Sequence, residues 1–154
     1  KRAAAAAGIN EKIFINTKGQ ISEGTVCNVF FVRKNMIYTP QLSCGLLPGI
    51  LREYIMERFQ VTETIIYPDE LMYYEECFVT NSLMGVMPVR QLGNICFPHR
   101  AKADEVREVY EKEKMSLALM MIKEKEPVDK ISKYTGYAID KLKEIAAAMG
   151  QTLV

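Results

Sequence analysis

The sequence predicts an α/β fold for about the first two-thirds of the chain and a helical C-terminal extension for the rest. Up to about residue 100, short runs of β-branched and aromatic residues alternate with turn residues, and one amphipathic helix interrupts them. From Asp104 onward, glycine is absent until Gly136 and apolar residues recur at helical intervals. We therefore divide the chain into residues 1–100 and 101–154.

The strands expected in the first part are short. They lie at 13–15, 26–32, 36–39, 61–67, 77–80 and 87–91. Lys34-Asn35 is expected to turn the chain between two of them. The helix is expected at 49–59, directly after a loop rich in Gly and Pro, and Lys1–Gly8 is interpreted as the end of a helix closed by Gly8.

The extension is expected to form a long helix, an interruption at Pro127, and then a helix, a turn at Gly136 and a further helix. Residues 127–145 have a faint likeness to a helix-turn-helix motif. Between Ala101 and Val154, however, ten basic residues balance ten acidic ones, which is not the charge pattern of a nucleic-acid reader. We interpret the extension as a solvated helical face or a helix that docks a partner, and expect no nucleic acid to bind.

The composition excludes several classes of function. A formal net charge of +1 gives no overall field that would attract polyanions or acidic lipids. No apolar stretch is long enough for a membrane span, and the isolated cysteines show no metal-ligand spacing, so neither a membrane nor a metal site is expected. We expect a cytoplasmic protein with reduced thiols, and His99 is expected to be an exposed loop residue.

A first candidate site segment runs from Gly19 to Asn28, where a carboxylate and an amide lie between β-like stretches. Glu23 has the chemistry to keep a pyridine nitrogen protonated, because a carboxylate facing such a nitrogen favours its charged form. The alternative is that Glu23 is a solvated turn residue, and the segment by itself favours that alternative.

A second candidate is the loop from Gly45 to Gly49, which opens directly into the expected helix. Unpaired backbone N–H groups and the positive end of the helix dipole form an anion site at such a position without any basic side chain. Turn geometry explains Pro48-Gly49 equally well, so this pattern is weak when taken alone.

A third candidate is the end of a strand at Thr80-Asn81-Ser82, where three consecutive side chains have groups capable of hydrogen bonding. Ser82 has a hydroxyl that suits a phosphate oxygen. The alternative is an Asx or Ser turn in which these side chains satisfy their own backbone. For this segment the two interpretations are equally supported.

Together, and in this order, the three segments resemble the class IV aminotransferase family, whose large domain is shared by branched-chain aminotransferases, D-amino-acid aminotransferases and aminodeoxychorismate lyases. The resemblance covers about residues 1–97 and implies an α/β fold with a mixed, barrel-like sheet and packed helices. The run FVTNSLMGVMPV is similar to the lyase branch, since branched-chain transaminases tend to carry a Gly-Thr-Ala-Ala run at residues 81–84.

The resemblance implies the cofactor pyridoxal 5'-phosphate and assigns roles to five residues. Glu23 is expected to face the pyridine nitrogen, and Asn28 to lie in the stretch beneath the ring. The backbone N–H groups of Ile50 and Leu51 are expected to hold the phosphate together with Ser82. Leu51 stands where the family commonly has threonine, so a hydroxyl is lost but the backbone donor is kept.

The family's catalytic Schiff-base lysine is expected upstream of residue 1, with the small N-terminal domain and its phosphate-binding arginine. No catalytic residue is therefore identified within the chain. By resemblance, the reaction is elimination of pyruvate from aminodeoxychorismate to give 4-aminobenzoate for folate synthesis. A class IV amino-acid transaminase is one alternative, and a non-catalytic, truncated or fused ligand-binding protein is another. The expected partners are a small amino substrate and, from the family, a second copy in a homodimer.

Overall fold

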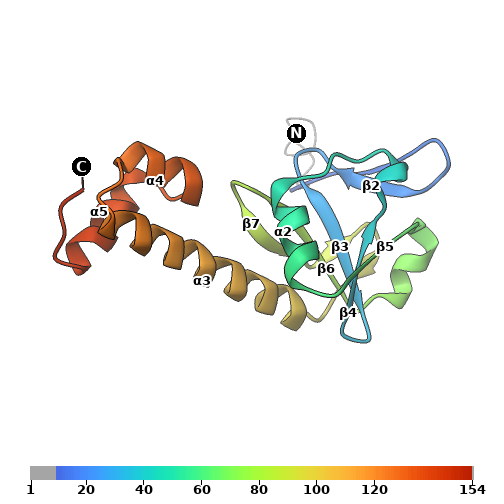
Figure 1. Cartoon of the computed structure of the whole chain (residues 1–154). Helices are drawn as coiled ribbons and strands as arrows, with labels where there is room; N and C mark the ends of the chain where they lie inside the picture. Colours follow the sequence, from blue (N-terminus) through green and yellow to red (C-terminus); the bar gives the residue numbers. More distant parts are fainter. Residues whose placement is uncertain (1–9, 154) are drawn as a thin grey trace. The chain divides into compact units, whose positions relative to one another are not determined.

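A computed structural model of the protein describes residues 10–153 (Figure 1). Its strands are β1 (Ile13–Ile15), β2 (Ile21–Gly24), β3 (Asn28–Arg33), β4 (Met36–Pro40), β5 (Val61–Thr64), β6 (Glu76–Asn81), β7 (Gly85–Val89), β8 (Gln91–Leu92) and β9 (Ile95–Cys96). Its helices are α2 (Ile50–Arg58), α3 (Ala101–Lys123), α4 (Val128–Thr135) and α5 (Ile139–Ala148), with short 3-10 helices at Leu42–Cys44 and Pro68–Tyr73. The helix end expected at Lys1–Gly8 lies outside the described residues.

The central element is a five-stranded mixed sheet with the order β5-β4-β3-β6-β7. Strands β4 and β5, which α2 connects, pair in parallel, and the other neighbours pair antiparallel. The predicted α/β class and the mixed sheet are confirmed. Within residues 10–153, however, β5 and β7 remain edge strands, so the sheet is open and does not close into a barrel.

The tight turn between β3 and β4 is the one that the sequence predicts. Lys34 and Asn35 both have positive φ angles, 47° and 63°. Two successive residues in this region form a type I′ turn, whose twist matches that of the strands it joins. The pairing of Arg33 with Met36 follows directly from this turn and sets the register of the hairpin.

The expected β3 strand begins two residues late, because Val26 and Cys27 belong to a turn instead. The backbone N–H of Gly24 donates to the carbonyl of Cys27 at 2.7 Å and closes this turn. The hydrogen bond uses groups that a continuous strand would offer to a neighbouring strand. Strand β3 therefore starts at Asn28, which directly follows the turn.

The two faces of the sheet carry different layers because side chains alternate along each strand. On one face, Val29 and Phe31 enter a buried cluster that includes Leu71 and Phe97. On the other face, Phe30 of β3 stacks on Phe78 of β6 with ring centroids 4.9 Å apart. Asn28 shares the face of Phe30, and the start of α2 lies against that side chain.

Residues 10–100, which contain the five-stranded sheet, are called the sheet domain below. A buried carboxylate at the start of β6 anchors helix α3 to this domain. Glu76 is 6% exposed, and its carboxylate accepts the backbone N–H groups of Lys102 and Ala103 at 3.0 and 3.1 Å. These donors have no partner within the helix, and the negative charge also suits the helix N-terminus. Helix α3 therefore begins at Ala101, three residues before the start expected at Asp104, because the cap comes from a distant strand.

Replacing Glu76 with alanine is expected to lower the free energy of unfolding of the sheet domain by about 1–3 kcal/mol, because two buried N–H groups lose their acceptor. Urea denaturation followed by circular dichroism measures this loss. Glu75→Ala is the matched control, since its exposed side chain is expected to contribute within about 0.5 kcal/mol. Equal stabilities for the two variants would show that Glu76 does not cap the helix.

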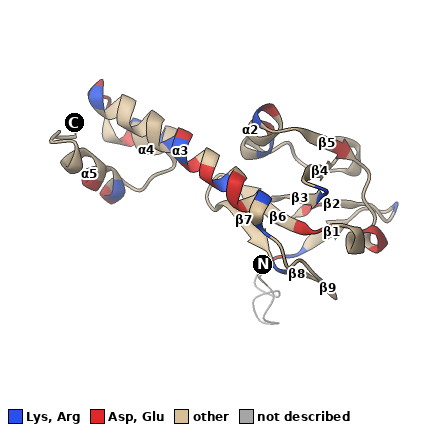
Figure 2. Ribbon diagram, turned by 90° about the horizontal axis from the view of Figure 1, so that it is seen from below, with Lys and Arg blue, Asp and Glu red and all other residues tan. Residues whose placement is uncertain are grey.

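The chain divides into two compact units, residues 1–107 and 108–154. The second unit has its own buried core, formed by α3, α4 and α5 through Ala118, Met121, Ile122, Ile131, Leu142, Ile145 and Ala146. The expected turn occurs at Gly136, which ends α4 with a φ of 71°. Acidic and basic residues alternate along α3 (Figure 2), where they form pairs such as Glu108 with Lys112 at 2.8 Å. That 101–154 acts as a separate extension stays a prediction.

Candidate functional site

The three segments singled out in the sequence meet around one cavity of about 280 Å³. The end of β2 and the following turn form one wall, the loop before α2 forms the second, and the end of β6 forms the third. The residues expected to bind the cofactor all line this cavity: Glu23, Asn28, Ile50, Leu51 and Ser82. The volume is close to the lower end of the range for small-molecule sites, about 300–1,000 Å³.

Glu23 lies at the end of β2 and is tied to the loop on the opposite wall. Its Oε2 accepts the backbone N–H of Leu47 at 3.1 Å. The carboxylate forms no ion pair with any residue from 10 to 153. Glu23 is half-buried, because the cavity beside it is open. Its carboxylate is therefore fixed in position and still accessible to a ligand.

Asn28 braces the loop that leads into α2. Its Nδ2 donates to the carbonyl of Leu47 at 2.8 Å. A Cβ added at Gly49 would collide with Oδ1 of Asn28, so the backbone of the loop approaches this amide more closely than any other residue type would permit. The glycine after Pro48 is therefore required by packing, in addition to the turn geometry considered in the sequence.

The first turn of α2 presents backbone N–H groups at the cavity. Gly49 is the N-cap and provides no side chain, so the N–H groups of Ile50 and Leu51 have no partner within the helix. The Ile50 side chain is exposed and the Leu51 side chain is buried. Leu51 therefore holds the helix start to the core beside the cavity that both residues line, and the unpaired donors with the helix dipole favour an anion there.

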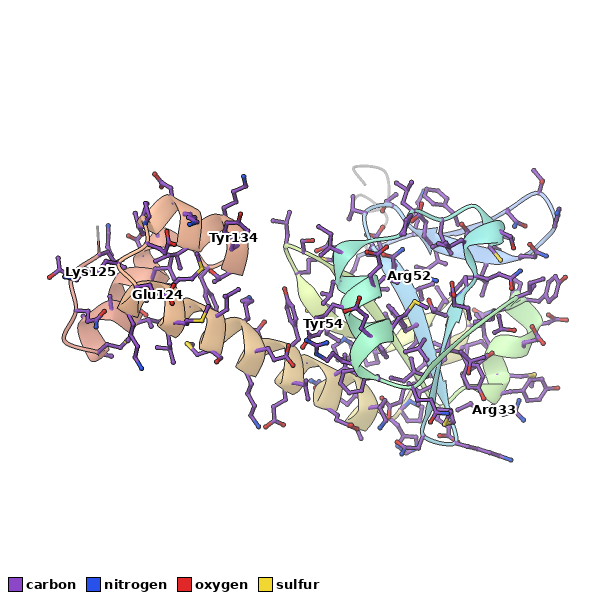
Figure 3. The ribbon with its side chains drawn as sticks, viewed as in Figure 1. Arg33, Arg52, Tyr54, Glu124, Lys125 and Tyr134 are labelled. Atoms are coloured by element: carbon purple, nitrogen blue, oxygen red, sulfur yellow. The ribbon has the colours of Figure 1, made fainter. Side chains whose placement is uncertain are left out.

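An ion pair between a buried arginine and a more exposed glutamate fixes the position of this helix turn. Arg52 is 2% exposed, and its Nη2 contacts Oε1 of Glu63 on β5 at 2.5 Å and donates to the carbonyl of Pro40 on β4 at 3.2 Å. Figure 3 labels Arg52 on α2. Sequence patterns did not reveal this pair, because the partners belong to a helix and a strand whose packing is set by the fold.

A second carboxylate, on Glu11, holds the turn between Glu23 and Asn28. Its Oε1 accepts the backbone N–H of Thr25 at 3.3 Å and also the Thr25 hydroxyl. Burial, together with the nearby Glu11 carboxylate, raises the pKa of the Cys27 thiol to about 11. The thiol in the cavity wall is therefore neutral and weakly nucleophilic at neutral pH.

The end of β6 combines the two interpretations that the sequence left open. Asn81 forms the Asx turn, since its Oδ1 accepts the N–H groups of Leu83 and Met84 at 3.0 and 2.7 Å. Its Nδ2 donates to the carbonyl of Val26 at 3.0 Å and joins this turn to the opposite wall. Ser82 is left exposed at the edge of the cavity, where its hydroxyl is accessible.

The lining contains donors but no cationic side chain. Among the described lining residues, Glu23 is the only one with a formal charge, and none is Lys, Arg or His. The groups of the lining that suit an anion are therefore the start of α2 and the hydroxyl groups, and Glu23 adds a single carboxylate. This combination fits a ligand that carries both a phosphate and a protonated ring nitrogen.

Comparison with known proteins gives the same assignment. The family model for amino-transferase class IV matches residues 1–92. A probable branched-chain-amino-acid aminotransferase of Thermotoga maritima is 36% identical over 90 residues, which are 55% of this chain and 33% of that protein. A putative 4-amino-4-deoxychorismate lyase of Legionella pneumophila has a similar structure, with a TM-score of 0.68 and 30% identity over 73% of this chain and 44% of the other.

The chain therefore belongs to the class IV aminotransferase family. Enzymes of this family depend on pyridoxal phosphate, and the branched-chain aminotransferase of Thermobaculum terrenum in its pyridoxal-phosphate form is a structural neighbour. Its TM-score is 0.62, with 27% identity over 70% of this chain and 39% of that protein. The chain thus spans about a third to under a half of the length of these three proteins. Within the described residues, no helix has the length and apolar character to cross a membrane.

Proposed function

We propose that the sheet domain is the cofactor-binding part of a pyridoxal-phosphate-dependent class IV enzyme. The observation that carries the proposal is the convergence of Glu23, the start of α2 and Ser82 on one cavity. The family match supports the same ligand. Bound pyridoxal phosphate supplies an electron-withdrawing ring on which negative charge from the substrate is delocalised.

Each residue has a distinct part in this proposal. The N–H groups of Ile50 and Leu51, with the Ser82 hydroxyl, hold the phosphate, and Glu23 holds a proton on the ring nitrogen. Asn28 positions the loop, because its amide is bonded to the Leu47 carbonyl. None of the described lining residues is a lysine, so the reactive amine comes from a segment outside residues 10–153 in this proposal.

For the reaction we propose elimination of pyruvate from aminodeoxychorismate, as in the lyase branch. Asn81-Ser82-Leu83-Met84 supports it, since these residues stand where branched-chain transaminases tend to have Gly-Thr-Ala-Ala. An amino-acid transaminase is the second candidate, supported by the 36% identity to the probable branched-chain-amino-acid aminotransferase of Thermotoga maritima. The two reactions are distinguished by the products of a longer protein that carries this chain. Release of 4-aminobenzoate together with pyruvate indicates the lyase, and conversion of an amino acid to its 2-oxo acid without 4-aminobenzoate indicates the transaminase.

Ser82→Ala is expected to weaken the binding of pyridoxal phosphate to the chain by about tenfold, because one hydrogen bond to a charged group is lost. Pyridoxal phosphate should raise the unfolding temperature of the chain, by an amount that depends on its affinity. Pyridoxal, which lacks the phosphate, should raise the unfolding temperature much less. Thermal unfolding at a series of ligand concentrations measures both effects.

Ser116→Ala is the matched control, because this exposed serine lies on α3 and does not line the cavity. It should leave the stabilisation by pyridoxal phosphate unchanged. Equal stabilisation of the wild-type chain by pyridoxal and by pyridoxal phosphate would contradict the phosphate site.

A further inference from the structure

Thr80 is a buried hydroxyl group without a hydrogen-bond partner in the wall of the cavity. The residue is 1% exposed and lines the cavity. Its Oγ1 is buried and forms no hydrogen bond within residues 10–153. Such groups are rare in folded proteins, because a hydroxyl removed from water without a partner destabilises the folded state. An unpaired hydroxyl at a ligand cavity is explained when the ligand provides the partner.

The neighbours of Thr80 leave this hydroxyl available. Thr80 pairs with Asn28 across β3 and with Val86 across β7. Strand alternation places Thr80 and Asn28 on the same face of the sheet, the face against which α2 begins. The Asn28 amide is already bonded to the Leu47 carbonyl, and Val86 is apolar. Neither cross-strand neighbour therefore supplies a partner for the Thr80 hydroxyl.

The position of Thr80 relates it to the anion end of the cavity. It lies two residues before Ser82 on the same segment, and Asn28 opposite it braces the loop before Ile50. The one charged side chain of the described lining, Glu23, is a carboxylate that repels a phosphate. A phosphate carries several acceptor oxygens and meets no cationic side chain among the described lining residues. Each additional hydrogen-bond donor therefore contributes to the affinity for a phosphate.

We propose that the Thr80 hydroxyl donates a hydrogen bond to the phosphate of the bound cofactor, as a binding residue in addition to Ser82 and the start of α2. The inference rests on the proposed function. Rotation about χ1 between staggered positions turns the hydroxyl toward the ligand on binding. Thr80 is thus left unpaired in the free chain and becomes paired in the complex.

Thr80→Val tests the proposal because it keeps the shape of the side chain and removes the hydroxyl. The free chain is expected to unfold at the same temperature or a higher one, since an unpaired polar group is replaced by a methyl group. The affinity for pyridoxal phosphate is expected to fall about tenfold, the effect of losing one hydrogen bond to a charged group. Thr80→Ser keeps the hydroxyl and should keep most of the affinity.

Thr39→Val is the matched control. Thr39 is also 1% exposed on a strand, but its Oγ1 donates to the carbonyl of Val29 at 2.8 Å and it does not line the cavity. The opposite result is expected for this variant, namely a lower unfolding temperature of the free chain and an unchanged affinity for pyridoxal phosphate. The two valine variants thereby separate a hydroxyl used in the fold from one used by the ligand.

The measurement is phosphorus NMR titration of the full chain with pyridoxal phosphate and with inorganic phosphate, beside thermal unfolding without ligand. The proposal is supported if Thr80→Val weakens both ligands while Ser82→Ala also weakens them. It is overturned if Thr80→Val leaves both affinities unchanged while Ser82→Ala reduces them, which would leave the proposed function standing. Absence of binding by the wild-type chain would overturn both.

Discussion

Replacing Glu63 with alanine is expected to destabilise the sheet domain by about 2–4 kcal/mol, because it leaves a buried guanidinium without its counter-charge. The Arg52 side chain is 3% exposed, whereas that of Glu63 is 38% exposed. Besides Glu63, Arg52 contacts the Pro40 carbonyl, and its Nε has no hydrogen-bond partner among the described residues. Urea denaturation followed by circular dichroism measures the loss.

Because Arg52 is more buried than Glu63, we expect substitutions of the two residues to lower the free energy of unfolding by different amounts. Arg52→Met should cost less than Glu63→Ala, since it leaves a carboxylate that water reaches in place of a buried cation. The double variant should be more stable than Glu63→Ala alone. Glu57→Ala is the control, because Glu57 is 72% exposed and lies 4.0 Å from Arg58, so its loss should cost about 0.5 kcal/mol or less. A Glu63→Ala cost no larger than that of the control would contradict the role of the pair.

Loss of the ion pair between Arg52 and Glu63 should also affect the cavity, because Arg52 directly follows the residues proposed to bind the phosphate. A helix that loses its tie to β4 and β5 no longer holds the N–H groups of Ile50 and Leu51 in a fixed position. Glu63→Ala should therefore also weaken the binding of pyridoxal phosphate, although Glu63 does not line the cavity. Titration under conditions where the variant is fully folded measures this effect separately from stability.

Glu23→Gln is expected to shift the protonation equilibrium of the bound ring nitrogen toward its neutral form by about 10- to 1,000-fold. An opposite charge within contact distance favours the protonated ring, and a neutral amide does not. The fold should tolerate the change, because glutamine retains an oxygen that can accept the Leu47 N–H. Nitrogen NMR of bound, ¹⁵N-labelled pyridoxal phosphate over a pH series reports the ring proton directly.

Two comparisons make this prediction specific to the charge of Glu23. Glu11→Gln changes a carboxylate that holds the neighbouring turn but does not line the cavity, so its effect on ring protonation should be much smaller. Thermal unfolding of the ligand-free variants shows whether the fold is intact. A ring nitrogen that titrates identically in wild type and Glu23→Gln would refute the proposed partnership with the carboxylate.

The elements that the sequence predicted correctly are those coded by neighbouring residues. The turn at Lys34-Asn35 and the start of α2 after Pro48-Gly49 depend on local backbone preferences, so the pattern was sufficient. The start of α3 was misplaced by three residues, because its cap is Glu76, on a strand far away in the sequence. The expected mixed sheet is confirmed, but only the structure shows that it is open within residues 10–153, since strand pairing is a long-range property.

The sequence by itself indicated the family and the cofactor class through a resemblance carried by residue types and their order, and it predicted five residues around the cofactor. Only the tertiary structure decided that these residues meet at one cavity, that Glu23 is half-buried, and that Asn28 braces the loop. It also distinguished Thr80 from Thr39, which are equally buried and chemically identical. The physical reason is that a hydrogen bond depends on distance and direction, and pairing of strands and helices far apart in the sequence sets both.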